Sequence, residues 1–172
     1  MWFMRMRPTG RKADPARSFK RRNAGWFAIK VELTDGRGQE FSPPPGRLFA
    51  AAPDHSFADL ANAIDHGFAR WDLGHLHEFQ LSDGTRVGLV HEDADDDLVD
   101  DRRFKLSRLS PGDQFVYVFD FGDDWTHRCT VSKGLIDPLE RLGMVPSRPT
   151  AFFGWGQIPD QYGRTSGEDV GS

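Results

Sequence analysis

The stretch that decides the fold is DQFVYVFDFGDDWTHRCTVSK, which runs from Asp113 to Lys133. Two runs rich in β-branched and aromatic residues flank a Gly-Asp-Asp turn, a pattern typical of a β-hairpin. With a three-residue loop at 122–124, the predicted register pairs Phe121 with Trp125, Phe119 with His127, Tyr117 with Cys129 and Phe115 with Val131. This register gathers nearly all of the large apolar side chains on one face, so burial of that face would select it.

The opposite face of this predicted hairpin is smaller and more polar. It carries Val116, Val118 and Asp120, and Arg128 lies within diagonal reach of Asp120 across the two strands. A one-residue slip would mix polar side chains of the second strand into the apolar face. The alternation therefore predicts a hairpin with one buried and one partly solvated face.

Length and composition predict a single folded domain. The chain has 172 residues, of which 38% are hydrophobic, and its 14 Phe and 5 Trp can build an aromatic core. The single cysteine, Cys129, rules out an internal disulfide bond and fits a reducing compartment. No apolar run approaches the ~20 residues of a membrane helix. We therefore expect a cytoplasmic protein without a membrane partner.

Charge is unevenly distributed along the chain. Residues 1–22 hold eight basic groups and one acid, whereas the remainder holds 14 basic and 25 acidic residues, a net charge of −11. Two interpretations of residues 1–23 stay open: a disordered, solvated tail, or an arm that neutralises nucleic-acid phosphates. In the second interpretation the candidate nucleic-acid-binding residues are Arg11, Lys12, Arg17, Lys20, Arg21 and Arg22.

The segments before the hairpin combine strands with one helix. Period-two alternation predicts strands at 26–34 and 75–81, shorter strands at 47–52 and 85–90, and turns between them. Ser56 and Asp59 form the signature of a helix N-terminus, and apolar residues at helical spacing continue through Phe68 to Trp71. This pattern predicts one main helix at about 56–70, and Gly74 fits its end.

The remaining segments carry weaker patterns. Residues 91–103 read as an acidic, solvated surface loop that lacks the glycine and terminal glutamate of an EF-hand. Residues 137–144 suggest a short helix. The aromatic segment 151–164 is too apolar for a free tail, so we expect Phe152, Phe153 and Trp155 to dock on the domain. Residues 165–172 are expected to be a disordered tail.

Three strings of the sequence carry a family resemblance. SFADLANAIDHGFARWDLGHLHEF, PGDQFVYVFDFGDDWTHRCTV and GWGQIPDQYGR together resemble the Ri-plasmid ORF-three-like family, whose members are also labelled TnpR passenger proteins of an insertion element. The resemblance covers about residues 26–164. Many relatives have a Pro-Pro-(Ile/Val)-Trp-Arg-Arg segment before the helix, which this chain replaces with PPGRLF at 44–49, so nothing that depends on that segment carries over.

The resemblance implies an α+β fold: a compact antiparallel β-sheet or roll with one main helix packed across it, as a single domain at 24–164. It implies no established activity. The TnpR label suggests a resolvase, but a serine resolvase needs a nucleophilic serine within an arginine cluster, and a tyrosine recombinase needs an Arg/His/Tyr constellation. The residues support neither, so the label describes genomic context.

The candidate site consists of histidines and carboxylates. His75 and His77 share one strand face, Asp123 and Asp124 lie on the hairpin turn, and His127 follows three residues later. Three histidines and a carboxylate could bind Zn²⁺ or another divalent ion, and a metal-bound water would make the site hydrolytic. Alternatively, each histidine lies on an aromatic face and hydrogen-bonds a backbone carbonyl or an aspartate. No catalytic nucleophile with an adjacent base is visible.

Two classes of function follow. The first, which the residues favour, is a non-catalytic binding or accessory protein of plasmids or mobile elements that contacts nucleic acid or a partner protein and needs no cofactor. The second is a metal-dependent enzyme of the hydrolase type that uses the His/Asp site.

Overall fold

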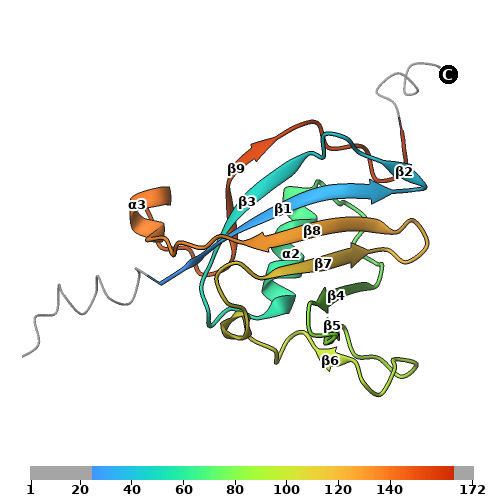
Figure 1. The fold of residues 1–172 in the computed structure, drawn as a ribbon. Helices are drawn as coiled ribbons and strands as arrows, with labels where there is room; N and C mark the ends of the chain where they lie inside the picture. The colour runs from blue at the N-terminus through green and yellow to red at the C-terminus, as the bar shows by residue number, and fades with distance from the viewer. Residues whose placement is uncertain (1–24, 165–172) are drawn as a thin grey trace, which may run out of the picture.

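A computed structural model describes residues 25–164, so the predicted disordered arm at 1–23 and tail at 165–172 lie outside the described residues. Figure 1 shows an open, twisted sheet with helix α2 lying across one of its faces. Nine strands form this sheet, and all of their pairings but one are antiparallel. The predicted α+β class, an antiparallel sheet crossed by one main helix, is confirmed.

The strand order of the sheet is β6-β5-β4-β7-β8-β1-β3-β9, with β2 paired to the end of β1. The predicted hairpin, β7–β8, therefore lies at the centre of the sheet. The elements in chain order are β1 (Phe27–Gly36), β2 (Gln39–Glu40), β3 (Gly46–Ala51), α2 (Phe57–Gly67), β4 (His77–Leu81), β5 (Arg86–Gly88), β6 (Val99–Asp100), the 3₁₀ turn η1 (Leu106–Arg108), β7 (Gln114–Phe119), β8 (Trp125–Val131), α3 (Pro138–Leu142) and β9 (Thr150–Trp155).

The predicted register of the central hairpin is wrong by two residues. Phe119, and not Phe121, pairs with Trp125, which leaves a five-residue turn at 120–124. The longer turn forms because Asp120 and Asp124 both adopt positive φ, a conformation that aspartate tolerates better than most residues. A shift of two residues preserves side-chain parity, so the predicted buried face is retained. Phe121 lies on the exposed turn instead.

The predicted contact of Arg128 with Asp120 is also wrong, for the same reason. In the observed register Arg128 lies opposite Glu32 of β1, and its guanidinium forms an ion pair of 3.1 Å with that carboxylate. Asp120 belongs to the turn and is buried there. The longer turn therefore separates the two residues that a three-residue loop would bring together.

The core lies between the sheet and α2. Each of the central strands contributes alternate side chains to the face that α2 covers, and the helix adds an aromatic and aliphatic stripe. The α2 members of this buried cluster are Phe57, Leu60, Ala61 and Ile64, followed by Phe68 just beyond the helix. The aromatic content of the sequence is thus concentrated in this single layer.

The helix N-terminus is the predicted one. The Ser56 side chain accepts a hydrogen bond from the Asp59 backbone N–H, and the Asp59 carboxylate accepts one from the Ser56 N–H. This reciprocal pair satisfies two of the free donors at the start of the helix.

The predicted end of the helix is wrong. The helix stops at Gly67, because Ala69 adopts φ 53° and the Ala69 and Arg70 N–H groups bond back to His66 and Asp65. The reversal directs Trp71 outward, where it is 52% exposed, although the helical spacing had placed it on the core stripe. Gly74 has no part in the helix end.

Within residues 25–164, the opposite face of the sheet is covered mainly by the segment around α3. There Ile136, Leu142 and Phe152 surround the buried Trp26. Of the three aromatic residues expected to dock on the domain, Phe152 packs against this cluster. Trp155 packs over Gly46, and its indole N–H donates to the Pro44 carbonyl. Phe153 is 61% exposed, so the prediction for it is wrong.

The acidic segment is only partly the solvated loop that the sequence predicts. Residues 91–97 are exposed apart from Ala94, but 99–100 form β6, which pairs in parallel with β5. Asp101, at the end of the same run, is 1% exposed. In the part of the chain with described coordinates, no helix is both long and apolar enough to cross a bilayer.

Candidate functional site

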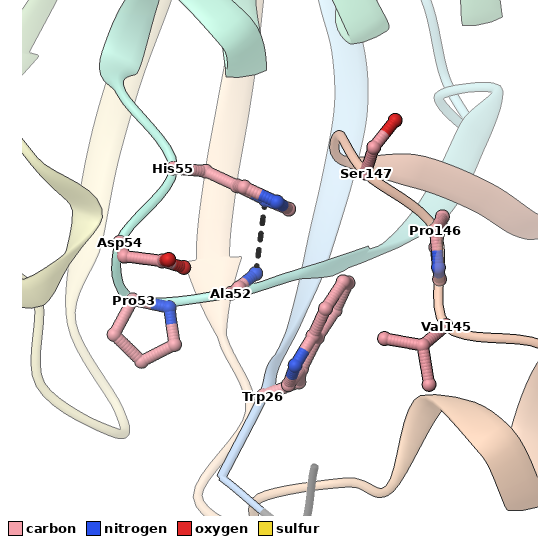
Figure 2. A pocket seen from close by; sticks show the side chains of 8 residues that line it. All are labelled: Trp26, Ala52, Pro53, Asp54, His55, Val145, Pro146 and Ser147. Carbon is pink, nitrogen blue, oxygen red and sulfur yellow. Dashed lines mark hydrogen bonds between the residues drawn. The ribbon is translucent and has the colours of Figure 1, made fainter. Parts of the chain in front are cut away.

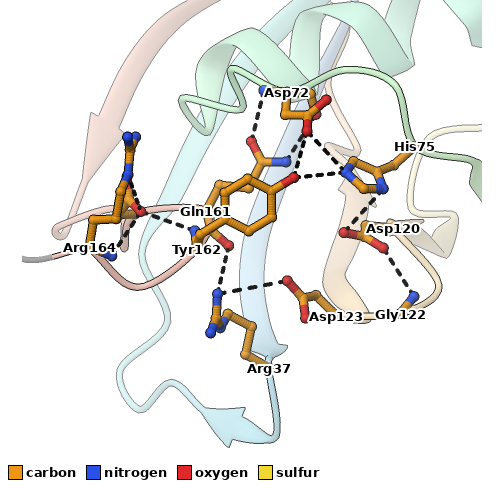
Figure 3. A network of polar contacts seen from close by, with 10 residues as sticks. Arg37, Asp72, His75, Asp120, Gly122, Asp123, Gln161, Tyr162 and Arg164 are labelled. Carbon is orange, nitrogen blue, oxygen red and sulfur yellow. Dashed lines mark hydrogen bonds and ion pairs between the residues drawn. The ribbon is translucent and has the colours of Figure 1, made fainter.

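Three segments that are distant in sequence meet at one edge of the domain. They are the loop 70–75 after α2, the hairpin turn 120–124, and residues 157–164, which we call the C-terminal strap. Each contains part of a string that carries the family resemblance. Figure 3 shows the polar network that joins them.

Gln161 fastens the strap to the loop. Its side-chain carbonyl accepts hydrogen bonds from the backbone N–H groups of Trp71 and Asp72, and its amide donates to the Asp72 carbonyl. The side chain is fully buried and uses both of its functional ends. The Gln161 side chain therefore hydrogen-bonds the backbone of the loop in the way that a neighbouring strand would.

His75 lies at the centre of the network. Its Nε2 atom is 2.9 Å from the Tyr162 hydroxyl, and its Nδ1 atom is 3.4 Å from an Asp120 carboxylate oxygen. The same hydroxyl is 2.6 Å from the Asp72 carboxylate. Tyr162 has one proton, and the short contact indicates that it donates this proton to Asp72 and accepts from His75. A doubly protonated ring would satisfy both Tyr162 and Asp120.

The electrostatics of Tyr162 and Asp72 agree with this assignment. The hydrogen bond to Asp72 raises the pKa of Tyr162 to about 12, so the hydroxyl keeps its proton at neutral pH. The reciprocal bond lowers the pKa of Asp72. Within residues 25–164, His75 bonds no Ser, Thr or Cys side chain, so the network lacks the nucleophile of a hydrolytic triad.

The two aspartates of the hairpin turn differ in their contacts. Asp123 lies 3.9 Å from the Arg37 guanidinium, and its backbone carbonyl accepts a hydrogen bond from the Arg37 N–H. Arg37 also reaches the Gln161 carbonyl at 3.5 Å, which connects the turn to the strap. Asp124 is exposed and caps the turn through its backbone bond to Asp120.

His77 binds a different carboxylate from that of His75. Its Nε2 atom is 2.6 Å from Asp101, whose second carboxylate oxygen is buried and has no hydrogen-bond partner among the described residues. The ring of His77 also contacts the ring of Tyr117, at a centroid distance of 5.8 Å. His77 therefore ties the acidic segment to the centre of the sheet.

His127 is a core residue. It is fully buried, its Nδ1 atom donates to the Tyr117 carbonyl at 3.2 Å, and its ring packs edge-on against Phe68. Because Nδ1 must carry the proton for this bond, Nε2 is left as an acceptor. Burial lowers the pKa of His127 to about 3, so the ring is neutral at physiological pH.

The five predicted metal ligands are thus divided among separate environments. His75 and Asp123 lie near the strap, Asp124 faces solvent, His77 binds Asp101, and His127 is enclosed in the core. Within the described range no three His, Cys, Asp or Glu side chains are gathered closely enough to hold a metal ion. The predicted metal site stays a prediction, and these positions lend it no support.

Arg70 is the most unusual buried group beside the network. It is 4% exposed, and its guanidinium lies 4.0 Å from the centre of the Trp125 ring. None of its three guanidinium nitrogens has a hydrogen-bond partner in the described part of the chain. Burial lowers its pKa to about 10, which still leaves it charged at neutral pH. The aromatic face of Trp125 is therefore its main compensation.

A second buried group connects α2 to the sheet. Asp65 is 5% exposed and accepts a hydrogen bond of 2.8 Å from the hydroxyl of Tyr117 on β7. Burial raises the pKa of Asp65 to about 6. This carboxyl therefore titrates near neutral pH although no solvent surrounds it.

Two cavities lie outside the network. The larger, of about 500 Å³, lies between Trp26, His55 and the loop 145–147 (Figure 2). There His55 packs edge-on against Trp26, and its Nδ1 atom accepts from the Ala52 N–H. The smaller cavity, of about 250 Å³, is lined by His77, Arg86 and the acidic loop. Neither was predicted from the sequence.

Several residues of the network and of the buried contacts near it are not predicted as site residues from the sequence. They are Asp65, Arg70, Asp72, Asp101, Gln161 and Tyr162, and Asp120 is expected only as a contact of Arg128. The string that contains Gln161 and Tyr162 carries part of the family resemblance, and that is the available signal. Asp101 lies in a run of similar acids, and nothing in the run distinguishes it.

The comparisons with known proteins agree with the resemblance. The plasmid pRiA4b ORF-3-like protein family matches residues 26–151 of the 172. The chain belongs to this family. The match ends before the strap, so Gln161 and Tyr162 lie beyond the part that defines membership. No curated protein matches the chain.

A solved structure supports the fold of this family member. It is the crystal structure of a protein of unknown function, MM3350 from Methanosarcina mazei Go1, with 23% sequence identity and a TM-score of 0.59. The similarity covers 80% of this chain and 74% of that one. At this identity the likeness concerns the fold alone.

Replacing Tyr162 by Phe tests the polar network. The variant loses the hydroxyl that is the largest cause of the lowered pKa of Asp72, so that pKa should rise toward its ordinary value. Side-chain carboxyl NMR measures it directly. As a control, Ser107→Ala removes an exposed hydroxyl that does not contact Asp72. An unchanged Asp72 titration in Tyr162→Phe would mean that the strap does not lie on the loop.

Replacing Asp65 by Asn tests the buried carboxyl. Because the folded-state pKa of about 6 exceeds the ordinary 3.8, the native state holds a proton between these values that the unfolded state has released. The free energy of unfolding of the wild type should therefore fall as the pH rises from about 4 to 6, by at most about 3 kcal/mol. The asparagine keeps the oxygen that accepts from Tyr117 but does not titrate.

Denaturant unfolding at pH 4, 5, 6 and 7 measures this difference. Relative to the wild type, Asp65→Asn should gain stability at each step toward pH 6. Taking the difference between the two proteins also cancels the contributions of the titrating groups that they share. The exposed carboxylate of Asp96 provides the control, Asp96→Asn, which should follow the wild-type profile. Parallel profiles for Asp65→Asn and the wild type would refute the raised pKa.

Proposed function

We propose that this chain is a non-catalytic binding protein associated with plasmids or mobile elements, and that its basic N-terminal arm contacts nucleic acid. The observation that carries the proposal is the separation of charge. Residues 1–22 hold eight basic groups and one acid, whereas residues 25–164 hold 14 basic and 23 acidic groups, a net charge of −9. The arm alone can therefore attract phosphates over distance.

The face of the sheet away from α2 supports the assignment of the nucleic-acid contact to the arm and not to the folded body. Its cations are already paired with acids: Lys30 and Arg128 both contact Glu32, at 3.2 and 3.1 Å. Arg86 forms a two-pronged pair with Glu78 on the same face. A phosphate backbone approaching this face would have to break these ion pairs, so we assign the nucleic-acid contact to the arm.

The side chains that could have supported catalysis are engaged in structural contacts. His75, His77 and His127 each bond a tyrosine, a carboxylate or a backbone carbonyl. Cys129 is fully buried, and burial raises the pKa of its thiol, which favours an inert residue. A metal-dependent hydrolase would need ligands that converge, and the described positions do not favour it. The reduced thiol fits the cytoplasm, where we place the protein.

The test of the arm uses the full-length chain and a variant in which six arm residues are replaced by Gln. Binding to a 30-base-pair DNA and to a single-stranded RNA is measured between 50 and 300 mM salt. The wild type should lose affinity steeply with salt, and the variant should bind at least tenfold more weakly at low salt. On DNA, the slope of log K against log salt should become shallower by up to about 5, because each phosphate contact contributes about 0.9. The residues replaced are Arg11, Lys12, Arg17, Lys20, Arg21 and Arg22.

A matched control neutralises cations of the body. Arg102 and Arg103 are exposed, so Arg102→Gln/Arg103→Gln removes two surface charges without touching the core. This variant should bind as the wild type does. Equal binding by the arm variant and the wild type would end the proposal for the arm. No binding to either nucleic acid at 50 mM salt would end the nucleic-acid function altogether.

A further inference from the structure

Strand β9 forms an edge of the sheet that is open to pairing. In the described part of the chain it pairs with β3 alone, so one side of its backbone has no partner strand. The opposite edge of the sheet is different, because β6 has only two residues and ends in an acid. Short, charged edge strands prevent pairing with other chains, whereas a six-residue edge strand invites it.

The composition of β9 favours pairing of this edge with another strand. Its sequence, TAFFGW, contains neither a charge nor a proline, and the Phe153 side chain is 61% exposed. One bulge, opposite Leu48 and Phe49, and Pro149 just before the strand limit pairing. The Trp155 carbonyl also accepts a hydrogen bond of 3.0 Å from the Arg47 guanidinium. An exposed aromatic side chain on an uncharged edge strand is typical of a surface that another strand covers.

The distribution of charge favours a second copy of this chain as the partner at this edge. The described body has a net charge of −9, so two copies repel each other over most of their surfaces. From Arg141 to Pro159, however, there is no acidic residue and there are two arginines. This acid-free stretch contains β9 and, earlier in the chain, the exposed Met144. It is therefore where two copies can meet without opposing carboxylates.

We propose that β9 pairs antiparallel with β9 of a second copy about a two-fold axis, so that one sheet continues through both copies. A two-fold arrangement uses the same patch on each side and closes, so it forms a dimer and does not extend further. A register centred on Phe153 places the two Phe153 side chains next to each other and buries the most exposed aromatic ring. The proposal does not depend on the nucleic-acid function of the arm.

Mass measurement on the full-length, untagged chain tests the dimer. Light scattering after gel filtration at 10 to 200 µM should give about twice the chain mass of 19.4 kDa for the wild type. Phe153→Lys should reduce the mass to that of one chain, because it places two like charges at the axis. Phe121→Lys, at an exposed aromatic residue on the distant hairpin turn, should leave the dimer intact.

A cross-linking measurement fixes the position of the axis. Directly opposed residues of an antiparallel pair have Cα atoms about 4.5–5.5 Å apart, a distance that a disulfide can bridge. Because Cys129 is buried, Phe153→Cys introduces the one exposed cysteine of the described chain, and mild oxidation should convert it to a covalent dimer. Phe121→Cys should not cross-link at the same rate. A wild type that stays monomeric at 200 µM, or a Phe153→Lys variant that dimerises as the wild type does, would overturn the proposal.

Discussion

One buried hydrogen bond, from the Tyr117 hydroxyl to the Asp65 carboxyl, fixes the position of helix α2 on the central hairpin. The apolar side chains around it provide most of the burial but little direction, because hydrophobic contact is not directional. A hydrogen bond inside that layer is directional, and a buried carboxyl that loses its partner destabilises the fold by several kcal/mol. Sliding the helix along the sheet would separate the pair. The loop after α2, and with it Arg70 and His75, is placed by this constraint.

The polar groups that the loop brings together have structural partners. Tyr162 and Asp120 hold His75, Asp101 holds His77, and the core encloses His127. The histidines that look like metal ligands in the sequence thus lie in three separate contacts. Gln161 and Tyr162 belong to a strap that lies outside the part of the chain matched by the family. We therefore propose that function lies in the basic arm and at the open edge of the sheet.

The sequence predicts the layers of this fold better than its turns. Strict alternation identified the buried face of β7–β8 correctly even though the register was off by two, since such a shift keeps parity. The loop length depended on left-handed conformations at Asp120 and Asp124, and the helix end on one at Ala69, where neither glycine nor asparagine signals it. Likewise, only the fold separates Asp101 from its acidic neighbours, because the Asp101 side chain, just after β6, is buried against His77.

The most direct test of the account is the metal content of the protein. Elemental analysis of the full-length chain purified without an affinity tag, followed by titration with Zn²⁺ while the ring signals of the histidines are observed by NMR, addresses the three separate environments at once. The account predicts well under one equivalent of any divalent metal, and ring signals of His75, His77 and His127 that do not shift together. One tightly bound equivalent that is lost in both His77→Ala and His127→Ala, with both variants still folded, would contradict it, because those rings would then be ligands of the same ion.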